Sequence, residues 1–424
     1  MSDAATYIEE LAAFIRESPS SYHAAAEAAR LLREAGFSQL DERAQWPAPR
    51  RGRAGRFFVL RDGAIVAWVQ PAGATASTPF NIVGAHTDSP GFKLKPNGGT
   101  SAHGWSQASV EVYGGPLLNS WLDRELELAG RLVLSDGREL LARTGPFLRI
   151  PQLAIHLDRG VNDGLKLDKQ QHVQPVFGVE ADGGDVLEAL AASAGVRRRE
   201  VRGFDVVTAD TQAPARFGVG GKLFAAGRLD NLSSVFAGLH ALLAAKPAKG
   251  SISVLAAFDH EELGSNSRSG ASGPLLDDIL TRIGDGLGAS ASDRLRAYAA
   301  SWCVSADAGH AVHPNYSERH DPANRPVAGG GTLLKLNANQ KYASDAHGAA
   351  LWAGLADAAG TRVQDFVSNN TVPCGSTIGP LTATRLGIRT VDVGVPLLSM
   401  HSARELCHVD DAHALALTLG EFYA

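Results

Sequence analysis

The stretch Ser251-Ile-Ser-Val-Leu-Ala-Ala-Phe258-Asp-His-Glu-Glu-Leu-Gly-Ser265 decides the fold of this chain. Its first half is an apolar run of strand length, which is typical of a strand buried on both faces in an α/β sheet. Glu261 and Glu262 follow the carboxyl end of that strand, where such sheets place their ligand sites. Neighbouring side chains point in different directions, so one glutamate can bind a metal while the other transfers protons. A glutamate pair alone is more often solvated surface, so the interpretation depends on the rest of the chain.

The composition is that of an ordinary soluble globular protein. The chain has 424 residues, of which 44% are hydrophobic and 20% charged, with a net charge of −5. This length predicts two domains, or one domain with a large insertion. The mildly acidic balance argues against a nucleic-acid partner, and neither a polybasic patch nor an apolar run of about 18 residues indicates a membrane partner. Cys303, Cys374 and Cys407 are spaced for neither a disulfide framework nor a zinc ribbon. With no secretory features at the N-terminus, we expect a cytoplasmic protein.

Hydrophobic periodicity and turn residues predict helices and strands on both sides of a differently patterned middle segment. Before that segment we expect two helices that meet at Ser18-Pro19, with Ser20 or Ser21 capping the second, and a hairpin that turns at Asp62-Gly63. The predicted strands are residues 56–61, 64–70, 80–85, 251–258, 302–306, 333–336 and 389–393, and the later helices are residues 231–245 and a final helix from Asp410.

The middle segment has strand-like runs at residues 109–113, 126–134 and 203–208, separated by glycine and proline turns. A helix is expected at residues 184–194, and the small residues at 284–292 are expected to form a loop. We therefore predict an α/β domain formed by residues 1–90 and 215–424, interrupted by a mostly β insertion of residues 91–214.

Histidine and carboxylate side chains recur where the predicted strands end. His86 and Asp88 follow one strand, Asp307 follows another, His401 lies in a loop after a third, and Asp230 stands where a helix begins. Each has an ordinary structural explanation: a buried histidine, a helix cap for Asp230, a turn cap for Asp307 and a loop histidine at position 401. Together with the glutamate pair, this mixed set suits zinc or a similar ion and is large enough for two metals that share a bridging aspartate. Two-residue spacing would let the Asp88 carboxylate orient the His86 imidazole.

The order His-x-Asp, Asp, Glu-Glu, Asp, His resembles that of the di-zinc exopeptidases. The surrounding sequence resembles the aspartyl aminopeptidase family, which includes the yeast vacuolar aminopeptidase I. Because the matching stretches are distributed along the chain, the resemblance is more specific than any one motif. They are Gly84-Ala-His-Thr-Asp-Ser-Pro90, Gly227-Arg-Leu-Asp-Asn231, Phe258-Asp-His-Glu-Glu-Leu-Gly-Ser265, Ser305-Ala-Asp-Ala-Gly-His-Ala-Val-His-Pro-Asn-Tyr316, Asn339-Gln-Lys-Tyr-Ala-Ser344, Pro373-Cys-Gly-Ser-Thr-Ile-Gly-Pro380 and Ser399-Met-His-Ser-Ala-Arg-Glu405.

The resemblance implies a fold, an activity and a set of roles. The fold is a mixed-sheet α/β catalytic domain with an inserted, mostly β dimerisation domain, and the activity is removal of an N-terminal Asp or Glu from peptides. The cofactor would be two divalent ions per subunit, zinc first, although cobalt and manganese suit the same ligands. In this resemblance Asp230 bridges the ions, His86 and Asp307 complete one site, Glu262 and His401 complete the other, Asp88 orients His86, and Glu261 is the base for the water that bridges the metals.

Specificity depends on fewer residues. Lys335 lies among apolar neighbours in Thr332-Leu-Leu-Lys-Leu-Asn337, and a partly buried ammonium needs an anion, which a substrate carboxylate can supply. The alternative is a lysine that snorkels from a strand edge. The resemblance implies that Lys335 and Tyr342 form the pocket for an acidic side chain, and that His310 contacts the substrate.

His156 is a further candidate, within the insertion. From the residues alone we expect a half-buried histidine in a strand. The resemblance implies instead that His156 reaches the active site of a neighbouring subunit, in a homo-oligomer built from dimers and assembled as a dodecamer.

The sequence departs from the family at His260 and Leu263, where we expect asparagine and valine, and His260 leaves the pH optimum open. Two alternative functions also stay open. One is an aminopeptidase of neutral or broad specificity, and the other is a non-catalytic assembly or cargo protein that retains the fold.

Overall fold

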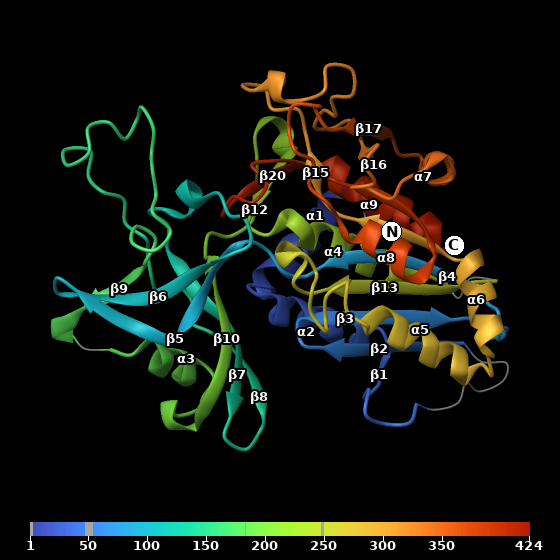
Figure 1. The fold of residues 1–424 in the computed structure, drawn as a ribbon, viewed down its shortest axis with the longest axis horizontal. Coiled ribbons are helices and arrows are strands. Elements are labelled where there is room, and N and C mark those ends of the chain that lie inside the picture. Colours follow the sequence, from blue (N-terminus) through green and yellow to red (C-terminus); the bar gives the residue numbers. More distant parts are fainter. Residues whose placement is uncertain (1–2, 47–53, 183, 247–249) are drawn as a thin grey trace.

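The computed structural model describes residues 3–46, 54–182, 184–246 and 250–424. A mixed nine-stranded sheet forms its centre, and the strand that opened the sequence analysis, β13, lies within it (Figure 1). The neighbours β13, β4, β14 and β18 run parallel. β3 is antiparallel to both β2 and β13, whereas β16 is antiparallel to β18 and parallel to β17. In spatial order the strands are β1 (Ser38–Gln39), β2 (Gly55–Arg61), β3 (Ala64–Gln70), β13 (Ile252–Phe258), β4 (Phe80–His86), β14 (Trp302–Ala306), β18 (Arg389–Gly394), β16 (Thr332–Leu336) and β17 (Val363–Val367).

Helices cover both faces of this sheet because alternate strand residues point to opposite sides. In β13, Leu255 and Ala257 pack into one core, whereas Val254, Ala256 and Phe258 pack into the other. The first core is shared with α1 (Ala4–Glu17), α2 (Ser21–Glu34), α4 (Leu229–Ala244), α7 (Ala346–Ala359) and α9 (Val409–Tyr423), and the second with α5 (Leu275–Gly286), α6 (Ala291–Ala300) and α8 (Ile378–Leu386). Within the described residues, no helix is long and apolar enough to cross a bilayer.

The predicted strands and the first two helices are confirmed, and Ser20 is the residue that caps α2. The loop expected at residues 284–292 is wrong in its extent. Gly284 lies inside α5, and Ser290 caps α6 in a capping box with Asp293, so the connection is only a few residues long. A helix tolerates a glycine near its end, and serine favours a new start, so composition alone overestimated this loop.

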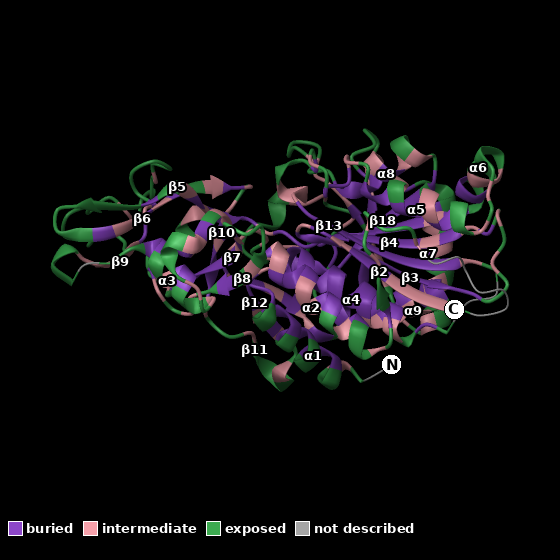
Figure 2. Cartoon of the chain, turned by 90° about the horizontal axis from the view of Figure 1, so that it is seen from below, coloured by how far each residue is buried: buried purple, intermediate pink, exposed green. Residues whose placement is uncertain are grey.

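Residues 91–210 supply every strand of a second, six-stranded sheet, which lies to one side of the central sheet in Figure 1. Its strands, in spatial order, are β8 (Glu139–Arg143), β7 (Leu126–Leu134), β10 (Val201–Asp210), β5 (Gly91–Ala102), β6 (Trp105–Tyr113) and β9 (Val176–Val179). With α3 (Val186–Ser193) this sheet encloses a core of its own, while its outer loops are exposed (Figure 2). Residues 91–214 as a separate domain stay a prediction that this arrangement suits.

A third, five-stranded sheet lies beside the carboxyl edge of the central one. Its order is β11 (Ala215–Phe217), β12 (Leu223–Ala226), β20 (Glu405–His408), β19 (Pro396–Leu398) and β15 (Gly309–His310). β20 pairs antiparallel with β12 on one side and β19 on the other. The segments that leave β12 and β19 carry two of the predicted ligands.

Candidate metal centre

The predicted ligands converge at the carboxyl ends of neighbouring strands. His86 is the last residue of β4, Asp307 follows β14, and Glu261 and Glu262 form a short 3-10 turn after β13. β4 lies between β13 and β14 and is parallel to both, so these ends meet at one edge of the sheet.

All five predicted metal ligands come together there, in two groups that share one aspartate. His86 Nε2 lies 3.3 Å from Asp230 Oδ1 and 3.5 Å from Asp307 Oδ1. His401 Nε2 lies 3.6 Å from Asp230 Oδ2 and 3.4 Å from Glu262 Oε2. Within each group the possible ligand atoms lie within 4.8 Å of one another. The two oxygens of Asp230 therefore face different histidines.

The charge of this cluster calls for a cation. Among the described residues, Asp230 Oδ1 and Glu262 Oε1 are buried without a hydrogen-bond partner. Burial, with repulsion from Asp230, raises the pKa of Glu262 well above its ordinary value. Burial opposes protonation of His401, yet the Asp230 and Glu262 carboxylates raise its pKa to about 10. Imidazole nitrogens and carboxylate oxygens with unmet demand for positive charge are a donor set that suits zinc.

Asp88 supports the glutamate pair as well as His86. His86 Nδ1 lies 3.0 Å from the Asp88 carbonyl oxygen and 3.5 Å from its carboxylate Oδ1. The same carboxylate accepts the backbone N–H groups of Glu261 at 3.0 Å and Glu262 at 3.2 Å, and the Tyr113 hydroxyl at 2.9 Å. Asp88 thus joins β4, the turn after β13 and the second sheet, which is a wider role than orienting one imidazole.

Glu261 lies beside the predicted ligands, and its carboxyl group is partly ionised near neutral pH. Its Oε2 lies 3.9 Å from His86 Nε2. Burial, with repulsion from Asp307, Asp88 and Asp230 and in spite of the attraction of His86, raises the pKa of Glu261 to about 7. A carboxyl group with this pKa can both take and return a proton near neutral pH.

Asp230 does not cap a helix, contrary to the ordinary explanation of a lone aspartate. α4 begins at Leu229, and Asp230 has an extended ψ of 102° inside its first turn. Its side chain faces the two histidines, while its backbone N–H donates to Glu405 Oε2 at 2.9 Å. The helix therefore starts irregularly where the aspartate enters the site.

Lys335 is fully buried in β16, which lies between β18 and β17, so the snorkelling alternative is wrong. Its side chain is 2% exposed, and Nζ lies 3.4 Å from Asp307 Oδ2 and 5.3 Å from the ring centroid of Tyr342. The lysine thus already has an anionic partner in Asp307. Tyr342 packs against Phe366, and the exposed His310 of β15 lies 6.0 Å from the same ring.

His156 lies apart from these residues, and the expectation of a half-buried strand histidine is wrong. Residues 151–160 are exposed and form no strand. Leu153, Ile155 and Leu157 in the same loop are 61%, 49% and 76% exposed. An alternation of apolar and polar residues resembles a strand, but among the described residues no strand pairs with this loop.

Three residues near the ligands were missed from the sequence. Gly115, just after β6, accepts the His401 Nδ1–H at 3.0 Å, and Tyr113 holds Asp88. Glu405 accepts the backbone N–H groups of Asp230 and His401. Glu405 stood in a matched stretch four residues after His401, which was a usable signal, whereas Tyr113 and Gly115 offered none.

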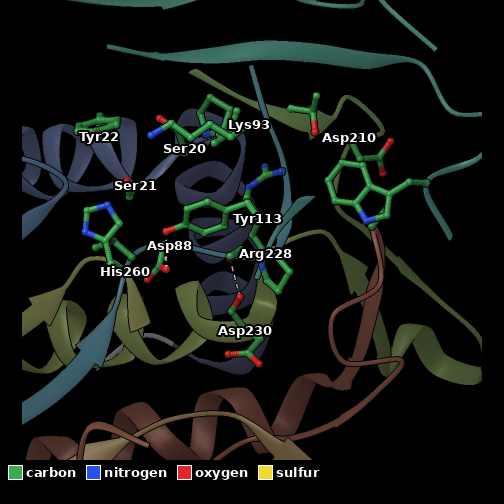
Figure 3. Close-up of a pocket in the computed structure, with 18 of the residues that line it drawn as sticks. Ser20, Ser21, Tyr22, Asp88, Lys93, Tyr113, Asp210, Arg228, Asp230 and His260 are labelled. Atoms are coloured by element: carbon green, nitrogen blue, oxygen red, sulfur yellow. Dashed lines mark hydrogen bonds between the residues drawn. The ribbon is translucent and has the colours of Figure 1, made fainter. Parts of the chain in front are cut away.

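A small cavity of about 50 Å³ adjoins this support (Figure 3). Tyr113, Asp88 and Asp230 line it together with Ser20 and Ser21 at the start of α2. His260 lines it too, with Nδ1 2.9 Å from Ser267 Oγ and Nε2 3.8 Å from Asp259 Oδ2. His260 therefore makes its side-chain contacts with Ser267 and Asp259 on this side of the site.

Comparison with known proteins assigns the chain to a family. The sequence model of the family described as aminopeptidase I zinc metalloprotease (M18) matches residues 14–423. The chain belongs to the M18 aminopeptidase family. It is 52% identical over 423 residues to a probable M18 family aminopeptidase 2 of Streptomyces avermitilis, covering 98% of this chain and 97% of that one.

Solved M18 structures share the whole fold. A chain in the cryo-EM structure of the Ape4 and Nbr1 complex is 34% identical, with a TM-score of 0.95, covering 99% of this chain and 86% of that chain. A chain of the S. cerevisiae mApe1 dodecamer is 29% identical, with a TM-score of 0.86, covering 98% of this chain and 95% of that chain. This M18 protein is therefore a zinc aminopeptidase with a mixed α/β fold.

Proposed function

We propose that this M18 aminopeptidase holds two divalent ions bridged by Asp230 and removes acidic residues from the N-termini of peptides. The supporting observation is that the groups His86, Asp230, Asp307 and Asp230, Glu262, His401 share Asp230, with one oxygen toward each histidine. Zinc is the expected ion, and cobalt or manganese suits the same ligands. The ions would act as partners for two buried carboxylate oxygens, Asp230 Oδ1 and Glu262 Oε1, which have no hydrogen-bond partner among the described residues.

The mechanism divides the work among the chain's own residues. Divalent ions bound here would polarise the scissile carbonyl and acidify the attacking water. Glu261 takes the proton of that water and delivers it to the leaving amine, for which a pKa near 7 is suited. Asp88 holds the backbone of Glu261 and Glu262, so the base and its neighbouring ligand keep a fixed separation.

Preference for an acidic residue is proposed from Lys335. A lysine ammonium has three N–H donors, so Lys335 can bind a substrate carboxylate while it keeps Asp307. Tyr342 and His310 flank Phe366 beside it and would line the same pocket. A neutral side chain would leave the buried ammonium with less compensation, which favours Asp and Glu.

We also propose a cytoplasmic homo-oligomer that is built from dimers and is dodecameric. The similar mApe1 structure is described as a dodecamer, which supports this assembly. The exposed apolar loop around His156 supports a partner surface, because isolated chains seldom expose several large apolar side chains together. In this proposal His156 enters the site of the adjacent subunit. Neither nucleic acid nor membrane is expected among the partners.

The principal test is Glu261→Gln. We expect loss of turnover on Asp-anilide with metal content unchanged, since the amide cannot accept the proton but leaves the ligands in place. Wild-type turnover in this variant would show that Glu261 is not the base. Less than one metal per wild-type chain, with no activity after metal addition, would favour the non-catalytic alternative.

Specificity is tested with Asp-, Glu- and Leu-anilides on wild type and Lys335→Ala. Loss of acid selectivity, with Leu-anilide cleavage retained, supports the pocket. Equal cleavage of all three by the wild-type enzyme would establish the broad-specificity alternative.

The trans role of His156 is tested by mixing two inactive variants, Glu261→Gln and His156→Ala. In a mixed dimer one site has its own Glu261 and the partner's His156. If His156 acts in trans, random pairing restores about a quarter of the wild-type activity. If it acts within its own subunit, mixing restores none.

A further inference from the structure

Glu405 connects the two chain segments that carry Asp230 and His401. It is the first residue of β20 and is 2% exposed. Its Oε2 accepts the Asp230 backbone N–H at 2.9 Å, and its Oε1 accepts the His401 backbone N–H at 2.8 Å. The Glu405 carboxylate therefore holds Asp230, which belongs to both ligand groups, and His401, which belongs to one of them.

The topology explains why a residue at this position can do so. β20 is the central strand of the five-stranded sheet, with β12 on one side and β19 on the other. The chain leaves β12 at Ala226 toward Asp230, and it leaves β19 at Leu398 toward His401. Glu405 pairs with Ala226 in the register of β20 and β12, at the end from which both ligand segments depart. Its backbone is fixed by the sheet, so its carboxylate is a rigid reference for both.

Both ligand segments need such a reference, because neither has regular backbone geometry. His401 has a φ of 65°, in the left-handed region that non-glycine residues seldom adopt. Asp230 leaves the helical region with a ψ of 102°. A left-handed conformation at a histidine persists only where surrounding groups determine it.

We propose that Glu405 is a positioning residue that sets the distance between Asp230 and His401, and thereby the affinity of the metal group that they share with Glu262. This inference rests on the proposed two-metal function. A carboxylate is required, because it presents two acceptors in one plane, whereas glutamine presents one acceptor and an amide N–H₂ that would face a backbone donor. Partners behind metal ligands typically affect metal affinity by about 10- to 100-fold.

The test compares Glu405→Gln with Glu127→Gln in the full-length enzyme. Glu127 is a matched control, since it is also 2% exposed and accepts two hydrogen bonds, from Arg143 in the second sheet. Zinc affinity is measured by competition with a chromophoric chelator, and kcat and KM are measured on Asp-anilide at saturating zinc. We expect zinc affinity at one of the two sites to fall about 10- to 100-fold in Glu405→Gln. We also expect a lower kcat with KM unchanged, and zinc affinity as in wild type for Glu127→Gln.

Two further measurements test the inference in case Glu405→Gln fails to fold. Glu405→Asp keeps both acceptors but shortens the side chain, and it should also weaken zinc binding. Hydrogen exchange in the wild type should show the His401 amide protected before and after chelation. Wild-type zinc affinity in a folded Glu405 variant, an equal loss in Glu127→Gln, or an unprotected His401 amide would overturn the inference. A wild-type enzyme that binds fewer than two ions would instead contradict the proposed function.

Discussion

Replacing Gly394 by alanine should damage the site, although the substitution adds only a methyl group. It ends β18, directly beside the segment that carries Asp307. A methyl group on its Cα would lie 2.8 Å from the Asp307 carbonyl carbon and 3.3 Å from the Ala308 Cα, and still closer to the Asp307 carbonyl oxygen. Asp307 cannot easily move away, because its N–H donates to the Val393 carbonyl at 3.0 Å. The neighbouring strand and the ligand segment are therefore held against each other.

The magnitude follows from these distances. Unbonded carbon atoms are most stable about 3.5 Å or more apart, so Gly394→Ala must displace the Asp307 carbonyl carbon by at least about 0.7 Å, and the closer carbonyl oxygen by more. Overpacking of this kind costs about 1–3 kcal/mol of folding free energy. A misplacement of about 1 Å in a reacting group costs about 100-fold in rate. We therefore expect kcat/KM on Asp-anilide to fall about 100-fold, with weaker zinc binding.

The assay measures kcat/KM, zinc content after dialysis and urea unfolding in Gly394→Ala. Gly354→Ala is the control, because Gly354 lies in α7 and its added methyl group would meet no atom of the described residues within 4 Å. That variant should keep wild-type activity and gain stability, since alanine favours the helix. If Gly394→Ala retains wild-type kcat/KM and zinc content, the reasoning that a fixed backbone positions Asp307 is refuted.

Three further outcomes are expected. Chelation should abolish activity and lower the melting temperature, and zinc should restore both, because an ion that binds only the folded state stabilises it; an unchanged melting temperature would contradict this. Burial, together with the charges of Arg143 and Arg228, lowers the pKa of His23 from 6.5 to about 4. The folded state therefore favours the neutral imidazole, and this contribution to stability is present above pH 6.5. As the pH falls toward 4, about 3 kcal/mol of folding free energy should be lost. Urea unfolding of His23→Gln at pH 8 and pH 4 should show that much less pH dependence than wild type, and an equal dependence would argue against the shift. Arg131 pairs with Asp62 of the central-sheet hairpin at 2.9 Å and with Asp205 of the second sheet at 2.8 Å. Because these ion pairs are only partly buried, Arg131→Met should cost about 1–2 kcal/mol in urea unfolding and speed proteolysis between the two sheets. Unaltered proteolysis would show that other contacts hold the sheets together.

The sequence predicted most accurately what depends on short-range patterns. An apolar run such as residues 252–258 can be satisfied only in a covered sheet, and the polar residues that end such runs then meet at one edge. His86, Asp307, His401 and the glutamate pair were found in this way, together with Asp230 at the start of a helix, and the family resemblance then implied a role for each. The helices α5 to α8 were not predicted. α6, α7 and α8 each bury only two or three residues, so their apolar pattern is weak. α5 has a regular apolar stripe from Leu275 to Ile283, a usable signal that was missed.

What the sequence could not indicate depends on contacts between distant segments. The anion beside Lys335 is Asp307, and local pattern offers no way to choose it over a substrate carboxylate. The hydrogen bond from Tyr113 to Asp88 depends on how the second sheet lies against the first. His156 shows the opposite error, since an apolar alternation predicted a strand where the chain forms an exposed loop.

The hydrogen bonds that shape the metal centre also determine when it can form. The bond from Asp230 to Glu405 spans 175 residues, and the bond from His401 to Gly115 spans 286. Contacts between residues so far apart slow folding, because a long loop must close before they form. During synthesis His86 emerges long before His401, so the early chain presents a partial ligand set with no geometry to select an ion. The complete metal site therefore forms late in folding. Until β20 is in place, the apolar strands of a nascent chain have to be protected from aggregation by other means.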